Sequence, residues 1–518
     1  VVWLMPRVSQ LARAMDARSR SPARQASRSS AGHVCLGGLR SLLRRLLRQR
    51  PPSPEHTPRA LRRHASLLYA VRQQLGSGAF GEVSLAASKR GGGECVLKVV
   101  ERGAVSDFDR LRREMLLHAR MDHPHVVRLY EGFLSRERAT ISMELCQGGD
   151  LAQALDERGR FVESEAQHVF SHVMRAVRYM HSKSLAHRDL KLDNFLLQHR
   201  DVPLQRNVVK AIDFGFAAKF KPGAKTLKTV CGTPGFAAPE VWAGGPYDEA
   251  CDIFSCGVIL FCMLGGRCPF EGSTASMLIR HTLLHPVDVA GSDFDGVSRE
   301  VRGLVRRMCC SIPERRPSAK AVLALASVQE SDDLWVDTPD VPLETMLRSM
   351  ASYCDLDFLA RAARYRVACY LDDSLLPSLR RAFKRIDADG DGRISLEELR
   401  RGCGPHGGIS GLEDLFRGLD LHRSGAIEYT EFLAAMFGRR PLPEAACRAA
   451  FQGLDVAVDD LVEVRDIIEA VGYEGGSKIS KKTMGKIDRP GMDFEEFMVL
   501  LSGGSPADGR GACALGGA

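Results

Sequence analysis

Residues 187–194 read HRDLKLDN, and they decide how the rest of this 518-residue chain is interpreted. Upstream, residues 75–83 read LGSGAFGEV, in which Gly76, Gly78 and Gly81 carry no side chains that would keep backbone N–H groups away from phosphates. Taken alone, these glycines also fit a dinucleotide-binding turn or an ordinary Gly-rich hairpin. The residues between and beyond the two stretches must therefore decide.

Charged residues follow the glycines in an informative order. Lys98 lies in the strand-like run CVLKVV, and Glu114 lies in the helical run RLRREMLLHARM. A dinucleotide-binding fold would instead place an acid at the end of its second strand, about 20 residues beyond the glycines. Asp213-Phe214-Gly215 and Ala238-Pro239-Glu240 come after HRDLKLDN. It is very improbable that five such elements would occur in this order by chance.

On these motifs, residues 69–327 resemble the eukaryotic protein kinases. The resemblance implies an α+β fold of two lobes with ATP and Mg²⁺ in the cleft. Lys98 would neutralise the α- and β-phosphates and Glu114 would orient it, while Asp213 and Asn194 would hold Mg²⁺. Asp189 would accept the proton of the substrate hydroxyl, because phosphoryl transfer depends mostly on positioning and charge neutralisation.

The resemblance also implies a nucleotide pocket. Val83 and Leu196 would sandwich adenine, and Met143 would lie at the back. Val96 replaces the usual Ala, which narrows the pocket. The nucleotide-binding residues expected are Leu75, Gly76, Ser77, Gly78, Ala79, Phe80, Gly81, Val83, Val96, Lys98, Glu114, Met143, Glu144, Cys146, Leu196 and Asp213, with Glu144 and Cys146 offering backbone hydrogen bonds.

Several positions bear on the substrate. Lys191, with a catalytic role beside Asp189 and Asn194, matches the Ser/Thr form of the loop, and Thr233 agrees. Asp150 and Asp193 match acidic positions that receive an Arg three residues before the acceptor, and carboxylates suit guanidinium geometry.

Two further contacts of the kinase region are expected. We expect Glu240 to pair with Arg316 and so fix the substrate-binding loop. As a minor hypothesis, Arg188 receives a phosphate on Thr229.

Residues 387–398 read DADGDGRISLEE and fit the 12-residue EF-hand loop at every position. Oxygen ligands are expected from the side chains of Asp387, Asp389, Asp391 and Glu398 and from the carbonyl of Arg393. Helical segments flank the loop, which argues against an ordinary acidic turn.

A second loop, residues 420–431, reads DLHRSGAIEYTE. We expect ligands from Asp420, Ser424, Ala426 (through its carbonyl) and Glu431. His422 stands where an oxygen ligand belongs, so we predict weaker and pH-sensitive binding.

Two further units complete residues 376–502. The third, residues 455–466, lacks a ligand at Ala457, and the fourth, residues 486–497, is too short before Asp493 to surround an ion. We predict that both pair for packing without binding calcium.

Kinase motifs followed by a basic amphipathic junction and EF-hands resemble the calcium-dependent protein kinases of plants, algae and protists. The resemblance covers residues 69–502 and implies an all-α, calmodulin-like EF-hand domain after the kinase. It also implies that a junction within residues 328–375 blocks the kinase until calcium-loaded hands bind it.

The ends of the chain differ in composition. Residues 1–68 carry 14 Arg and two acidic residues, which gives them a net charge of +12. Because the whole chain has a net charge of +8, the remaining residues have a net charge of −4. We expect a disordered leader, with residues 39–50 either forming a basic amphipathic helix on a membrane or an organelle-targeting element, or making few contacts. Residues 503–518 read as a disordered tail. The folded part has no basic excess to attract nucleic acid.

The apolar run Phe254 to Gly266 is too short to span a bilayer, and the cysteines lack a disulfide or metal spacing. We therefore predict a cytoplasmic, calcium-activated Ser/Thr kinase that acts on proteins. The alternatives are a catalytically silent, calcium-responsive scaffold and a kinase regulated by separate calmodulin.

Overall fold

The computed structural model describes residues 65–78, 81–89, 93–101, 108–135, 138–325, 328, 340–371, 376–403, 411–455, 459–471 and 491–504. The Arg-rich leader up to residue 64, two residues of the glycine loop (Ala79 and Phe80) and the tail from residue 505 lie outside this description. The predictions made for those segments therefore stay predictions.

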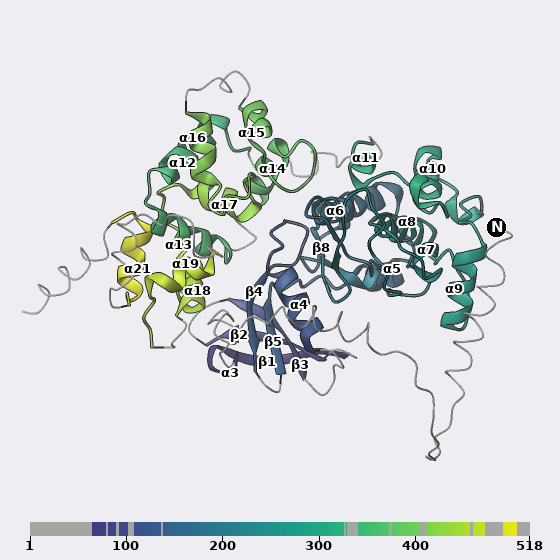
Figure 1. The fold of residues 1–518 in the computed structure, drawn as a ribbon, viewed down its shortest axis with the longest axis horizontal. Helices are drawn as coiled ribbons and strands as arrows, with labels where there is room; N and C mark the ends of the chain where they lie inside the picture. The colour runs from purple at the N-terminus through teal and green to yellow at the C-terminus, as the bar shows by residue number, and fades with distance from the viewer. Residues whose placement is uncertain are drawn as a thin grey trace, which may run out of the picture.

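The N-terminal lobe is an antiparallel sheet in the order β1-β2-β3-β5-β4, with the longer of its two helices packed against it (Figure 1). Leu111 and Met115 of that helix pack on Val100 and Ile141 of the sheet. The elements are a short helix α3 (Ala65–Leu68), β1 (Tyr69–Gly78), β2 (Gly81–Ser88), β3 (Glu94–Glu101), α4 (Phe108–His118), β4 (Leu129–Leu134) and β5 (Arg138–Met143).

The β1–β2 hairpin comes very close to the neighbouring strand at Gly81. Its φ is +134°, and a Cβ there would lie 2.0 Å from the carbonyl oxygen of Val99. Only glycine fits this position, because any side chain would push the hairpin away from β3.

The C-terminal lobe is built around the buried helices α6 and α8, which pack together in one apolar core. Two small sheets, β6–β9 and β7–β8, hold the loops that face the other lobe. The elements are α5 (Leu151–Arg158), α6 (Glu163–Ser182), β6 (Leu185–Ala186), β7 (Phe195–Leu197), β8 (Val209–Ala211), β9 (Ala218–Lys219), α7 (Pro239–Trp242), α8 (Ala250–Gly265), α9 (Ala275–Leu284), α10 (Arg299–Met308) and α11 (Ala319–Leu323), with 3₁₀ turns η4 (Leu192–Asn194), η5 (Leu204–Arg206), η6 (Ser292–Phe294) and η7 (Pro313–Arg315).

The remaining helices form a second body with its own core, which runs from Met346 to Leu501. Helix α13 is central to it and packs against α17, α18, α19 and α21. The helices are α12 (Leu343–Cys354), α13 (Phe358–Ala368), α14 (Pro377–Ile386), α15 (Leu396–Gly402), α16 (Leu412–Leu419), α17 (Tyr429–Phe437), α18 (Glu444–Leu454), α19 (Val464–Ala470) and α21 (Phe494–Leu501). The predicted fold class, an α+β domain followed by an all-α domain, is confirmed.

Short β-bridges join the loops of this helical body in pairs. Ile394 bridges to Ile427, and Val462 bridges to Met492. The third and fourth units therefore pair with each other, as the sequence predicts.

None of the helices within the described ranges is both long and apolar enough to cross a bilayer.

Candidate active site and calcium loops

Three elements meet at Lys98. The register of β2 and β3 places Lys98 opposite Val83, and α4 brings Glu114 to the same point. The distance from Lys98 Nζ to Glu114 Oε1 is 3.6 Å, in an ion pair that is largely shielded from solvent. A Cβ on Gly215 would lie 3.2 Å from Glu114 Oε2 and 3.1 Å from Asp213 Oδ1. The lysine, its acidic partner and the Asp213 turn therefore converge on one place.

A column of buried rings ties α4 to the loops of the C-terminal lobe. Phe214 is 1% exposed, and its ring centroid lies 4.7 Å from His118 and 5.4 Å from His187. His118 Nε2 lies 2.7 Å from the carbonyl oxygen of Val127. Burial lowers the pKa of His118 to about 4, so the ring is neutral at pH 7 and packs as an aromatic. The column holds Glu114 and Asp213 in one arrangement.

Asp189 is held through its carboxylate and through its backbone carbonyl. Thr233 donates its hydroxyl to Asp189 Oδ1 at 2.7 Å, and Asn194 Nδ2 donates to the Asp189 carbonyl oxygen at 2.8 Å. Lys191 begins the 3₁₀ turn that carries Asn194. The residues expected to position the reacting groups thus lie on one short loop. Thr233 contacts that loop from the segment between β9 and α7.

A buried carboxylate on α8 supports this loop from below. Asp252 accepts the backbone N–H groups of His187 at 2.9 Å and Arg188 at 2.8 Å. Burial would raise the pKa of Asp252, but the hydrogen bond and charge of His181 outweigh burial, and the pKa is lowered. Asp252 therefore stays ionised and fixes the backbone of the loop.

Arg188 makes protein contacts of its own. Its Nε donates to the Phe216 carbonyl at 2.7 Å, and its Nη1 donates to the hydroxyl of Tyr247 at 3.2 Å. The Tyr247 hydroxyl in turn donates to the carbonyl oxygen of Thr229 at 2.6 Å. Hydrogen bonds through Tyr247 thus already join Arg188 to the segment in which a phosphate on Thr229 was hypothesised.

The expected adenine pocket lies between the lobes. Val96 pairs with Met143 across β3 and β5, and Leu196 lies on β7. The Glu144 N–H donates to the Arg128 carbonyl at 2.9 Å, so a contact with adenine from Glu144 would come from its carbonyl. Its carboxylate is paired with Lys210 at 2.6 Å.

The predicted pair of Glu240 and Arg316 is confirmed. Two guanidinium nitrogens donate to the two carboxylate oxygens at 2.6 Å and 2.8 Å. The guanidinium also lies over the ring of Phe254, 5.1 Å from its centroid. This bidentate geometry joins α7 to the end of the lobe.

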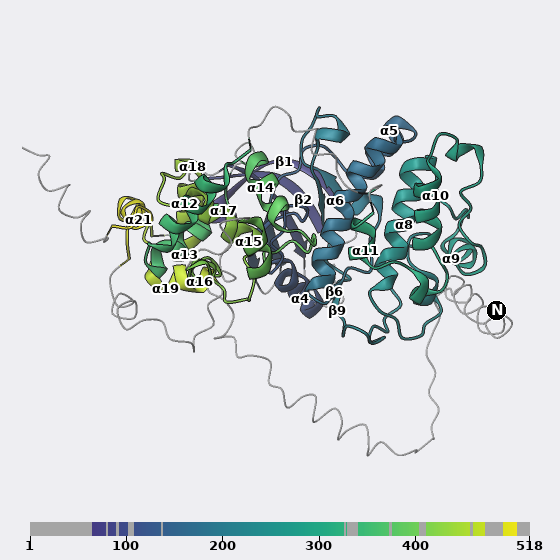
Figure 2. The same cartoon turned by 90° about the horizontal axis from the view of Figure 1, so that it is seen from above.

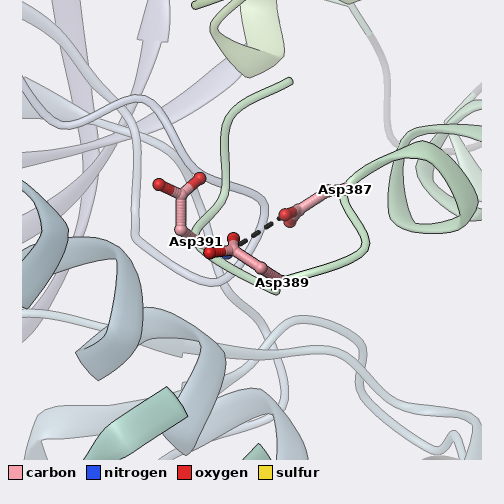
Figure 3. A group of neighbouring side chains, drawn as sticks. All are labelled: Asp387, Asp389 and Asp391. Carbon is pink, nitrogen blue, oxygen red and sulfur yellow. Dashed lines mark hydrogen bonds between the residues drawn. The ribbon is translucent and has the colours of Figure 1, made fainter. Parts of the chain in front are cut away.

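The first loop of the helical body gathers three carboxylates. Ligand atoms of Asp387, Asp389 and Asp391 all lie within 4.8 Å of one another (Figure 3). Glu398 approaches from the start of α15 and accepts the N–H groups of Asp389 at 3.2 Å and Ser395 at 2.9 Å. Burial, followed by the charge of Asp391, raises the pKa of Asp387 to about 7. Negative charge is thus concentrated on one turn, which a divalent cation would relieve.

The second loop has the same backbone path but different side-chain contacts. Asp420 accepts the N–H groups of Ser424 at 2.8 Å and Gly425 at 2.9 Å. His422 Nδ1 lies 2.6 Å from Glu431 Oε1, so the expected closing carboxylate is already paired. Burial opposes a charged ring, but the hydrogen bond and charge of Glu431 raise the pKa of His422. The hydroxyl of Ser424 donates to the Ala426 carbonyl at 2.8 Å.

Comparison with known proteins agrees with this geometry. The protein kinase domain family matches residues 69–326, and the EF-hand domain pair matches residues 377–437. Calcium-dependent protein kinase 11 of Oryza sativa subsp. japonica is 30% identical over 460 residues, which cover 86% of this chain and 78% of that protein. The chain belongs to the calcium-dependent protein kinases.

Relatives from distant organisms give the same result. Calcium-dependent protein kinase 3 of Plasmodium berghei (strain Anka) is 29% identical over 83% of this chain and 79% of its own length. Calcium-dependent protein kinase 17 of Arabidopsis thaliana is 28% identical over 85% of this chain and 84% of its own length. The chain is therefore a Ser/Thr protein kinase, of a kind that uses ATP, Mg²⁺ and Ca²⁺ and acts on protein substrates.

In this calcium-dependent kinase the first calcium loop contacts the kinase domain directly. Arg178 of α6 and Lys320 of α11 reach the same oxygen, Asp389 Oδ2, at 2.9 Å and 3.1 Å. A Cβ on Gly392 would lie 2.4 Å from the ring of His123. The loop therefore lies flush against the kinase, and Figure 2 shows α14 and α15 beside α6.

The second loop contacts the same kinase face. Asp122 accepts the backbone N–H of Thr430 at 2.8 Å and its hydroxyl at 2.7 Å. Lys183 pairs with Glu428 at 2.9 Å, and the hydroxyl of Tyr179 lies 3.4 Å from the same carboxylate. We call this face, formed by Asp122, Arg178, Tyr179 and Lys183, the loop platform. Sequence reasoning missed it, because these residues carry no motif and lie far from the loops in the chain.

Helix α13 and the residues that follow it also contact the kinase domain. Arg128 donates to the Cys369 carbonyl at 2.7 Å, and Arg366 donates to the Tyr130 carbonyl at 3.2 Å. The rings of Tyr130 and Tyr370 stack with centroids 5.1 Å apart. The end of α13 is thereby fastened to β4, on the lobe that carries the nucleotide loop.

Proposed function

We propose that this kinase transfers the γ-phosphate of Mg-ATP to Ser/Thr hydroxyls of proteins, and that calcium on its own first two EF-hand loops turns the transfer on. The observation that carries this proposal is that the contacts of the catalytic cleft and the contacts of the docked EF-hand loops are formed in the same conformation. The Lys98–Glu114 pair and the Thr233–Asp189 bond are formed while both calcium loops rest on the loop platform. An assembled cleft and a docked calcium domain are thus compatible.

The residues of the cleft suit phosphoryl transfer. Lys98, aligned by Glu114, would neutralise phosphate charge, and Asp189, aligned by Thr233, would receive the hydroxyl proton. The amide hydrogen bond of Asn194 to the Asp189 carbonyl leaves an amide oxygen as a ligand, and Asp213 supplies carboxylate oxygens. This oxygen donor set fits Mg²⁺, which would neutralise the charge that develops on the transferred group.

The first loop fits Ca²⁺ on similar grounds. Its three neighbouring carboxylates place negative charge on one turn, and burial followed by the charge of Asp391 raises the pKa of Asp387, so a bound cation would relieve an unfavourable arrangement. Arg393 is expected to add its carbonyl and Glu398 its two oxygens. The second loop would bind more weakly, because calcium must compete with His422 for Glu431.

For regulation, we infer that the junction helices α12 and α13 block the kinase when calcium is absent. In support, α13 packs against helices of both EF-hand pairs and its Arg364 donates to the carbonyls of Leu501 and Arg440, at 2.8 Å and 2.9 Å. These contacts with the EF-hand helices would keep α13 out of the cleft between the kinase lobes. The second EF-hand pair, which we predict to bind no calcium, would thus take part in holding this helix.

For the substrate, we infer a preference for Arg three residues before the acceptor. Asp193 is exposed on the catalytic loop, and Asp150 caps α5 by accepting the Gln153 N–H at 2.8 Å. Replacing that Arg by Ala in a peptide substrate should lower kcat/KM by about tenfold or more. An equal kcat/KM for the two peptides would contradict the preference.

The test is phosphate transfer to an Arg-containing peptide, with calcium or with a chelator. We expect calcium-dependent transfer by the wild type and none by Asp213→Asn. Neither Glu398→Gln nor the wild type in chelator should transfer phosphate. Absence of transfer by the wild type in calcium would support the silent scaffold. Activation that requires added calmodulin would support the second alternative.

A further inference from the structure

Two cysteines face each other where α8 ends. Cys262 lies in the last turn of the helix and is fully buried, whereas Cys268 lies just beyond the helix and is exposed. The Cys262 thiol donates a hydrogen bond to the Cys268 sulfur, with the two sulfurs 3.7 Å apart. A disulfide needs them about 2.05 Å apart. The sulfurs are therefore in contact but unbonded.

The turn between them is rigid. Gly266 adopts φ +69° and donates its N–H to the Cys262 carbonyl at 2.9 Å. A Cβ on Gly266 would lie 2.3 Å from the carbonyl oxygen of Gly159. On the far side, Phe270 is buried, and its ring centroid is 6.2 Å from that of Phe254. Both ends of the segment are anchored, so the sulfurs remain neighbours.

The two thiols differ in acidity. The hydrogen bond from Cys262 lowers the pKa of Cys268 to about 7, against the opposing effects of burial and of the charge on Asp193. The same hydrogen bond, with burial, raises the pKa of Cys262. By contrast, burial raises the pKa of Cys95 to about 11 and that of Cys309 to about 12. Cys268 thus combines exposure with thiolate character, the two properties of a reactive cysteine.

We propose that Cys262 and Cys268 form a reversible disulfide when the kinase meets a peroxide. The Cys268 thiolate attacks the O–O bond and becomes a sulfenic acid, and the hydroxide that leaves takes up a proton to form water. The Cys262 sulfur then attacks the sulfenic sulfur, the S–O bond breaks, and a second water leaves with the thiol proton. Two thiols lose two electrons and the peroxide gains them.

The first test treats the full chain with a small excess of hydrogen peroxide and analyses a non-reducing tryptic digest by mass spectrometry. Cleavage after Arg267 separates the two cysteines, so a disulfide appears as a linked peptide pair that is two hydrogens lighter than its parts and is released by dithiothreitol. Because Cys231, Cys251 and Cys256 lie on the same tryptic peptide as Cys262, fragmentation of the linked pair assigns the bond. Cys309→Ser serves as the control and should still form the link. Cys268 recovered as a free thiol, or linked to another cysteine, would overturn the proposal.

Variants of Cys262 separate the roles of the two sulfurs. Cys262→Ser keeps a hydrogen-bond donor, and Cys262→Ala does not, so half-maximal alkylation of Cys268 by iodoacetamide should stay near pH 7 in the first and rise in the second. In both variants dimedone should trap a sulfenic acid on Cys268 that the wild type converts to disulfide. Absence of dimedone adducts would contradict the order of attack. These readouts need no phosphate transfer, so they stand even if the proposed function fails.

Discussion

The two calcium loops share a backbone but differ in what their third residue contacts. In the first loop Asp389 Oδ2 contacts Arg178 and Lys320 of the kinase while its Oδ1 accepts the Asp391 N–H within the loop. The closing Glu398 accepts backbone N–H groups and the hydroxyl of Ser395. In the second loop His422 turns inward and pairs with the closing Glu431 at 2.6 Å.

The side chain at the third position of the loop therefore decides whether the closing carboxylate can bind a calcium ion without first losing a side-chain partner. Neutral donors can keep their places around a carboxylate that binds calcium, whereas an imidazole on the oxygen must be displaced, which weakens binding. The kinase domain enters the comparison too, because Arg178 and Lys320 contact Asp389, an expected ligand of the first loop, whereas Lys183 pairs with Glu428 of the second loop, which is not among its expected ligands. Three predictions test these statements.

The largest effect is expected from the closing residue of the first loop. Glu398→Gln removes the charged, two-oxygen ligand and should weaken calcium binding there by about 100-fold. Glu431→Gln should cost the second loop about tenfold or less, because its carboxylate is already engaged by His422. Calorimetric titration of the full chain measures both.

Glu397→Gln is the matched control for this variant. Glu397 precedes Glu398 but its side chain is 64% exposed and pairs with Arg400. Its replacement should leave calcium binding unchanged. Equal losses in Glu398→Gln and Glu431→Gln would remove the distinction between the loops.

A smaller effect, in the direction of tighter calcium binding, is expected at the third position of the second loop. His422→Asp frees Glu431 and adds an oxygen ligand, so calcium should bind there about tenfold more tightly. Arg423→Asp places an Asp one residue later, outside the ligand set. It changes the net charge at least as much as His422→Asp does, yet it should tighten calcium binding much less. If the two variants gave the same gain, general electrostatics would explain it rather than ligand identity.

The smallest effect is expected from the kinase cations. The Arg178 side chain is 17% exposed and that of Lys320 is 61% exposed, so Arg178 should interact more strongly with Asp389. Arg178→Ala should tighten calcium binding to the first loop by about threefold, and Lys320→Ala by less. By linkage, calcium must weaken these ion pairs by the same factor that they weaken calcium binding.

Calorimetry at low and high salt checks this point. The gain in Arg178→Ala should shrink as salt screens the pair in the wild type. A loss of calcium affinity would show instead that the cations organise the loop, which would reverse their assigned role.

Much of the molecule could be predicted from the sequence, because several functions depend on residues that lie close together in the chain. The first calcium loop takes its carboxylates from one turn, so residues 387–398 were enough to place it. The kinase motifs are short as well, and their order indicated the two-lobed fold. The bidentate pair of Glu240 and Arg316 could be foreseen only through resemblance to a known family.

Other features could not be foreseen. His422 was recognised as a misplaced ligand, but its pairing with Glu431 depends on how the loop closes around α17. The contact of Cys262 with Cys268 depends on the left-handed turn at Gly266, which brings the chain back to the end of α8.

The sequence by itself determined the chemistry of each part, since the ligand set of a loop and the charges of a catalytic motif are fixed by residue type and spacing. Only the tertiary structure decided that the calcium loops rest on α6 of the kinase and that α13 lies among the EF-hand helices. The physical reason is that Asp122, Arg178 and Lys320 are ordinary surface residues until folding brings Thr430 and Asp389 to them. Such contacts depend on shape and burial across distant segments, which no local pattern records.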